Sequence, residues 1–130
     1  MQKLKNVPDT PAPLGPYCSG TISSGPFLFV SGQGPYDPDS GKIDGSLSVA
    51  EQTRLTLNCV DRVLKAGGSD RSQVVSCRVF LSELNESTFA EMNAVYDEFF
   101  GDHTPARTTV GSALLNIDVE IDCIAQIPSS

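Results

Sequence analysis

The chain has 130 residues and carries 9 lysines and arginines against 16 aspartates and glutamates, a formal net charge of −7. Its apolar content of 39% and charged content of 19% suit one folded domain with a single core rather than a disordered chain. The acidic balance argues against a nucleic-acid partner and against an anionic membrane surface, because both are bound mainly through lysine and arginine.

The chain shows no sign of export or membrane insertion. There is no run of 18 apolar residues, and no apolar stretch follows the N-terminal lysines, so neither a transmembrane helix nor a signal peptide is expected. Four widely spaced cysteines, without CxxC spacing, are interpreted as reduced and buried thiols: Cys18, Cys59, Cys77 and Cys123. We therefore expect a cytoplasmic protein. His103 is the sole histidine, and no metal site is expected.

The first half of the chain predicts two strands and a helix. One domain over 1–130 is expected to begin with an extended segment, 1–14, and the prolines of 8–16 favour extended chain or loop. Residues 21–24 and 27–31 predict a hairpin that turns at Gly25-Pro26, and 32–45 predict a long loop.

The first helix has clear start and stop signals. Ser48-Val49-Ala50-Glu51 has the sequence of a capping box. Leu57, Val60 and Leu64 then follow helical spacing, and Gly67-Gly68 ends the pattern. Together they predict a helix of about five turns.

The second half predicts a strand, a helix and two more strands. Residues 74–81 alternate in the manner of a strand, and the next helix begins at Asn85 or Ser87 and ends at Gly101. Its apolar residues share one face: Phe89, Met92, Tyr96, Phe99 and Phe100. Strands over 106–112 and 119–127 are expected to pair as a hairpin. The order β-β-α-β-α-β-β predicts an α+β sandwich with two helices on one side of a sheet.

Three polar residues stand out against this pattern. Arg107, at the start of a strand, could hold a small carboxylate through two parallel hydrogen bonds, or could lie on the surface. Glu120, inside an apolar run, could be a partly desolvated base or an exposed residue. Asn93, on the second helix, could fix the backbone or face a ligand. By themselves these residues predict a small α+β domain that could bind an anion.

A series of short motifs occurs in one order from about residue 11 to residue 127. They include Gly15-Pro16-Tyr17, Phe29-Val30-Ser31-Gly32-Gln33, Phe89-x-x-Met92-Asn93-x-x-Tyr96, Pro105-Ala106-Arg107 and Val119-Glu120-Ile121-Asp122. Collinear over most of the chain, these motifs resemble the RidA/YjgF family.

The resemblance implies a fold, an assembly and an activity. It implies a chorismate-mutase-like sandwich of the YjgF type with a mixed sheet, assembled as a homotrimer with clefts between subunits. It also implies hydrolytic deamination of reactive enamines and imines, of the 2-iminopropanoate or 2-iminobutanoate type, to 2-oxo acids and ammonia. No cofactor is expected.

The resemblance also assigns roles to residues. It makes Arg107 the group that binds the substrate carboxylate, Glu120 the group that positions the attacking water, and Tyr17 a wall of the pocket. The cleft is expected to be lined by Ser31, Gly32, Asn93 and Thr109. Thr109 stands where many deaminase members carry a cysteine, so thiol chemistry is not expected there.

The predicted hairpin adds a geometric constraint. With a turn near residue 115, Arg107 would pair near Ile124 and Glu120 near Gly111, which separates the two by about 13 Å along the strands. A site assembled across subunits would relieve that separation.

Two other functions stay open. The altered sequence after Arg107 suggests a pathway-specific relative, such as a 2-aminomuconate or aminoacrylate deaminase. A non-catalytic trimer that binds a small molecule, or regulates through one, is the second alternative. RNA cleavage, also linked to the family, is disfavoured by the charge of −7.

Overall fold

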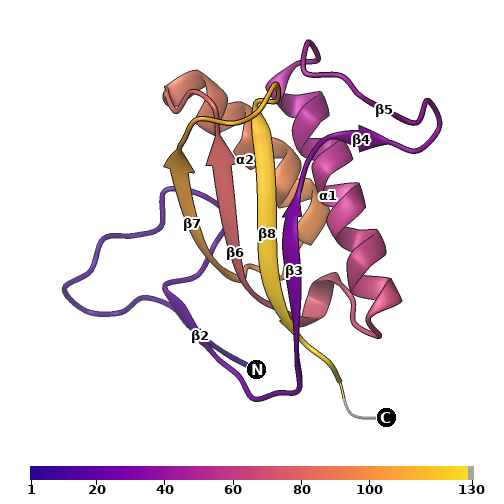
Figure 1. Ribbon diagram of the computed structural model, residues 1–130. Helices are drawn as coiled ribbons and strands as arrows, with labels where there is room; N and C mark the ends of the chain where they lie inside the picture. The colour runs from indigo at the N-terminus through magenta and orange to yellow at the C-terminus, as the bar shows by residue number, and fades with distance from the viewer. Residues whose placement is uncertain (129–130) are drawn as a thin grey trace.

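The computed structural model describes residues 1–128, and its centre is a four-stranded sheet in the order β3-β8-β6-β7 (Figure 1). The strands are β3 (Phe27–Gln33), β8 (Val119–Gln126), β6 (Val74–Leu81) and β7 (Ala106–Gly111). β6 and β7 run parallel, whereas β8 is antiparallel to both of its neighbours. The sheet is therefore mixed.

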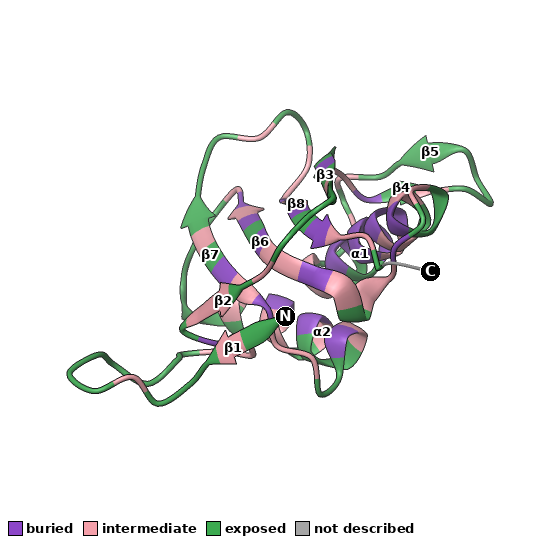
Figure 2. Cartoon of the chain, turned by 90° about the horizontal axis from the view of Figure 1, so that it is seen from below, coloured by how far each residue is buried: buried purple, intermediate pink, exposed green. Residues whose placement is uncertain are grey.

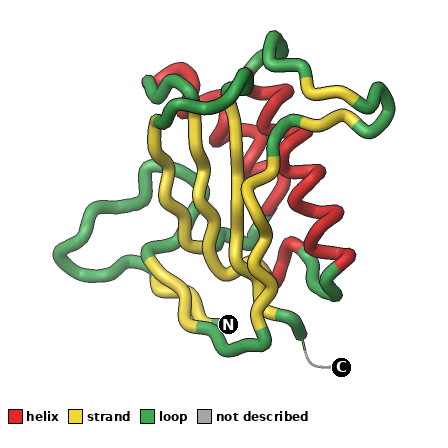
Figure 3. Tube along the Cα trace, viewed as in Figure 1, coloured by secondary structure: helices red, strands yellow, loops and turns green. Residues whose placement is uncertain are grey.

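Two helices cover one face of this sheet, as Figure 3 shows. α1 (Val49–Ala66) is capped by Ser48, whose hydroxyl accepts from the Glu51 N–H at 3.1 Å. The Glu51 carboxylate turns to Arg54 instead of completing the predicted capping box. α2 (Glu86–Phe100) begins at Asn85 with a full capping box and ends at Gly101. The predicted α+β class, with both helices on one face, is confirmed.

Two predicted strand pairings are wrong. β2 (Gly20–Ile22) does not form a hairpin with β3 but pairs with β1 (Gln2–Leu4) in a separate two-stranded sheet. The last two strands are not neighbours either, because β6 lies between β7 and β8. Helix α2 returns the chain across the sheet and so permits the parallel β6–β7 pair, which leaves β8 to enter on the other side of β6.

The stretch predicted as a loop over 32–45 holds regular structure. β3 continues through Gln33, and the pair β4 (Tyr36–Asp37) and β5 (Lys42–Ile43) projects from one end of the sheet (Figure 1). One 3-10 turn, η1 (Arg71–Gln73), leads into β6. The loop between β1 and β2 extends beyond the β7 edge, where Cys18 forms a bridge with Ala106.

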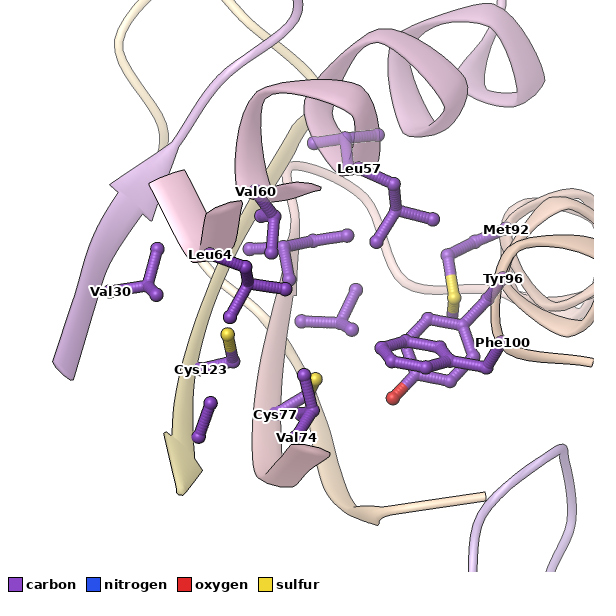
Figure 4. Packing of buried hydrophobic residues seen from close by; sticks show 14 of the residues in the cluster. Val30, Leu57, Val60, Leu64, Val74, Cys77, Met92, Tyr96, Phe100 and Cys123 are labelled. Atoms are coloured by element: carbon purple, nitrogen blue, oxygen red, sulfur yellow. The ribbon is translucent and has the colours of Figure 1, made fainter. Parts of the chain in front are cut away.

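The core lies between the sheet and the helices, and Figure 2 shows stretches coloured as buried on both helices and on the central strands. Figure 4 shows Leu57, Val60 and Leu64 from α1 and Met92, Tyr96 and Phe100 from α2 pointing at residues of β6 and β8. All four cysteines are free and buried, as predicted. Among residues 1–128, no helix has the length and apolarity that a membrane crossing requires.

Gln52 fixes the turn that leads into β8. It is fully buried on α1, and its Nε2 donates to the carbonyls of Gly45 and Leu47 and to the Asp118 carboxylate at 2.9 Å. Its Oε1 accepts from the Asp118 N–H at 2.8 Å. The side chain therefore ties the start of α1 to the chain just before Glu120.

We expect Gln52→Leu to lower the free energy of unfolding by about 2–4 kcal/mol, because it leaves several buried polar groups without a hydrogen-bond partner. Urea unfolding followed by circular dichroism measures the change. Gln2→Leu, on the exposed strand β1, is the control and should shift the free energy by less than about 0.5 kcal/mol. Equal effects of the two substitutions would contradict the role given to Gln52.

Candidate active site

Arg107 is a buried cation held among aromatic rings. It lies on β7 beside Cys77 of β6, points to the side of the sheet that the helices cover, and is 9% exposed. Its guanidinium carbon lies 4.8 Å from the ring centres of Tyr17 and Tyr96 and 5.6 Å from that of Phe89. Such contacts attract a cation and hold it in one orientation.

The aromatic rings leave the charge of Arg107 unpaired. None of the ion pairs found within residues 1–128 involves it, and its Nε and Nη2 are buried without a hydrogen-bond partner. Burial lowers the pKa of Arg107 from its ordinary value. Because an unpaired buried charge is costly, this guanidinium is suited to bind an anion that enters from outside.

A cavity of about 200 Å³ opens beside the guanidinium. Its lining consists of Leu14, Tyr17, Phe89, Arg107 and Thr109. The Thr109 hydroxyl is buried there without a partner, and the Tyr17 hydroxyl accepts from the Leu14 N–H at 3.1 Å. The residues of the lining therefore combine one cation, one buried hydroxyl without a partner and an apolar wall, which suits a small organic acid.

Gly15 and Asn93 close the other side of the guanidinium. A Cβ atom at Gly15 would lie 2.9 Å from Nη2 of Arg107 and 3.0 Å from the Asn93 amide. Only glycine allows the loop between β1 and β2 to approach this closely. The Asn93 oxygen is buried and has no partner, so the amide is placed beside the anion site and does not fix the backbone through that oxygen.

Glu120 lies on the opposite face of the sheet. It pairs with Phe80 of β6 and alternates with the buried Val119 and Ile121, so its side chain points away from the helices. Gly32 of β3 lies against it: a Cβ at Gly32 would be 2.8 Å from Oε2 of Glu120. Ser31 and Gly32 also line a groove of about 610 Å³ on this open face.

The predicted site residues thus form two groups. The structure brings Tyr17, Asn93, Arg107 and Thr109 together on the helix-covered face, and Ser31, Gly32 and Glu120 together on the open face. The predicted pairings of Arg107 with Ile124 and of Glu120 with Gly111 are wrong, because both residues pair with β6. Within one subunit the sheet itself separates Arg107 from Glu120.

Sequence reasoning missed four residues of the cavity and its surroundings. They are Leu14, Gly15, Phe89 and Tyr96. Phe89 and Tyr96 belong to the apolar face predicted for α2, which indicates a core, whereas Asn93 on the same helix is the residue that the sequence predicts to face a ligand. Asn93 lies on α2 next to this apolar face and beside the Arg107 guanidinium, so it marks the boundary between the core and the candidate site.

We expect Gly32→Ala to displace the Glu120 carboxylate and to lower any activity that depends on it about tenfold or more, because a methyl group would enter the position next to Oε2. The fold should survive, because the blocking atoms belong to a side chain. Gly20→Ala is the matched control, since a Cβ there meets only ordinary contacts at 3.5 Å. Steady-state kinetics and thermal melts of both variants test this prediction, and unchanged kinetics in Gly32→Ala would contradict it.

Comparison with known proteins identifies the family. A family model described as Endoribonuclease L-PSP matches residues 7–127. The Escherichia coli protein named 2-iminobutanoate/2-iminopropanoate deaminase is 36% identical over 125 residues, 94% of each chain. A candidate regulator of Lactococcus lactis, AldR, is 38% identical over 123 residues, 93% of this chain and 94% of that one.

A solved structure agrees over the whole fold. Escherichia coli TdcF with bound serine matches with a TM-score of 0.70 and 32% identity, over 98% of this chain and all of that one. The fold, the motifs and these matches have a single explanation: the chain belongs to the Endoribonuclease L-PSP family, the RidA/YjgF family that its motifs resemble.

Proposed function

We propose that this protein hydrolyses reactive 2-imino acids, and the 2-enamino acids from which they form, to 2-oxo acids and ammonia. The observation that carries the proposal is the buried, unpaired Arg107 beside a cavity of about 200 Å³. A 2-imino acid has one carboxylate, which matches the planar fork of one guanidinium, and a C=N carbon next to it. Relatives named as imine deaminases support the proposal.

The chemistry needs only water and a group that handles protons. Water adds to C2 of the protonated imine, so that a C–O bond forms and the C=N bond becomes a single bond. Glu120 takes one proton from the water and returns it to nitrogen. As the C–N bond breaks and ammonia leaves, Glu120 takes the remaining hydroxyl proton and the C=O bond forms. Arg107 keeps the carboxylate fixed, and this converts the addition to a reaction between held partners.

We further propose that Arg107 and Glu120 meet between subunits of a homotrimer. The two side chains lie on opposite faces of one sheet, so a cleft that holds both needs Glu120 of a neighbouring copy. The open face carries exposed apolar side chains, including Phe29 at 70% exposure and Ile124 at 36%. A second copy would bury them. This assembly would also place Ser31 and Gly32 in the cleft.

A coupled assay tests the proposed activity. A threonine dehydratase releases 2-iminobutanoate, and semicarbazide traps whatever is not hydrolysed first. Adding the protein should lower semicarbazone formation and raise 2-oxobutanoate, in proportion to protein concentration. The same trapping yield with and without protein would remove the deaminase proposal.

The second candidate function is binding without turnover, which a relative named as a candidate regulator favours. The same cavity would then hold a small acid, and Glu120 would have no chemical task. Titration calorimetry with 2-oxobutanoate separates the two: binding that Glu120→Gln leaves intact, together with no effect on semicarbazide trapping, would favour this candidate. A pathway-specific deaminase would instead be distinguished by its preference among substrates.

A further inference from the structure

Thr109 lines the cavity beside Arg107 and carries a buried hydroxyl without a partner. The two residues are two positions apart on β7, so their side chains emerge on the same face of the sheet. The Thr109 Oγ1 is buried and has no hydrogen-bond partner within residues 1–128. A buried hydroxyl without a partner is uncommon in folded proteins, and here it belongs to a residue that lines a cavity.

The other four residues of this lining offer no second unpartnered hydroxyl. Leu14 and Phe89 are apolar, and the Tyr17 hydroxyl already accepts from the Leu14 N–H. Arg107 is the single charged residue of the lining. When the guanidinium has bound one carboxylate, two unpartnered polar oxygens remain beside it, the Asn93 amide oxygen and the Thr109 hydroxyl, and only the hydroxyl belongs to the lining of this cavity.

We propose, on the basis of the proposed function, that Thr109 selects 2-imino acids that carry a neutral hydrogen-bonding group, a hydroxyl or carboxamide, at C3 or C4. An aliphatic substrate would leave the Thr109 hydroxyl without a partner. A second carboxylate would have no second cation to meet. A cavity of about 200 Å³ is small, so the group that meets Thr109 lies close to the carboxylate that Arg107 binds.

Two isosteric substrates test this selection. L-Amino-acid oxidase, with catalase present, converts homoserine and norvaline to 2-imino acids that differ only by hydroxyl against methyl at the chain end. We expect the native protein to hydrolyse the homoserine-derived imine with a kcat/KM about tenfold higher. Thr109→Val, which keeps the shape and removes the hydroxyl, should lose that preference, because kcat/KM should fall more for the homoserine-derived imine than for the norvaline-derived one. Thr109→Ser should keep it.

The outcomes separate this inference from the deaminase proposal. Equal losses on both substrates in Thr109→Val, or no preference in the native protein, would overturn the role of Thr109. If the native protein hydrolyses neither imine, the deaminase proposal fails. Calorimetry with the products 4-hydroxy-2-oxobutanoate and 2-oxopentanoate then decides the selection by itself: a Kd about tenfold lower for the hydroxylated acid, lost in Thr109→Val, supports it, and equal Kd values overturn it.

Discussion

Replacing Arg107 by lysine is expected to lower kcat/KM for imine hydrolysis about a hundredfold or more. Lysine keeps the positive charge but loses the fork that makes two parallel hydrogen bonds to a carboxylate. It also loses the flat face that contacts the rings of Tyr17 and Tyr96. Each hydrogen bond to a charged group is worth about 1.5–3 kcal/mol, so losing the bidentate contact accounts for a change of this size.

Arg54→Lys is the matched control for this experiment. Arg54 lies on the surface of α1, where it pairs with Glu51 at 2.6 Å, and its side chain is 52% exposed. The substitution should leave kcat/KM unchanged in the coupled assay. Similar losses in Arg54→Lys and Arg107→Lys would show that the loss does not come from the anion site.

The stability of an Arg107 variant should not follow its activity. The guanidinium is buried with two nitrogens unpaired, so the folded protein holds an uncompensated charge. Arg107→Met replaces it by an apolar side chain of similar length, and we expect the free energy of unfolding to stay the same or to rise by about 1 kcal/mol. Urea unfolding measures it. A marked loss of stability would mean that Arg107 serves the fold rather than a ligand.

The local structure of the chain was predictable because its signals are local. The alternation in 74–81 is β6 itself, and the caps at Ser48 and Asn85 place the starts of both helices. Strand partners depend on segments far apart in the chain. The hairpin expected between β7 and β8 relied on their closeness in sequence, whereas the parallel β6–β7 pair inserts β6 between them.

The sequence predicted which residues belong to the candidate site, but not all of their positions relative to one another in the fold. The face of Glu120 could be read from β8, where buried and polar residues alternate strictly. The face of Arg107 could not, because β7 continues with Thr108, Thr109 and Val110, which give little polar contrast. The aromatic rings around Arg107 come from α2 and from the loop before β2, and no sequence pattern links those segments to β7.

That separation of faces leads to the second large effect, the rescue of activity by mixing two inactive variants. Arg107→Ala and Glu120→Gln should each be nearly inactive alone. If every site takes Arg107 from one subunit and Glu120 from its neighbour, mixed trimers contain some sites with both groups intact. Random mixing of equal amounts makes about a quarter of the sites intact, so activity should recover to about 25% of the native value.

The mixing experiment needs subunit exchange and a control. The two variants are unfolded together in urea and refolded, and native mass spectrometry confirms that mixed trimers have formed. Arg107→Ala mixed with the Arg107→Ala/Glu120→Gln double variant should regain nothing, because no subunit in that mixture carries Arg107. Mixed trimers without recovered activity would show that the two groups do not share a site. Recovery requires two copies at each site, because the sheet separates Arg107 from Glu120 within every subunit.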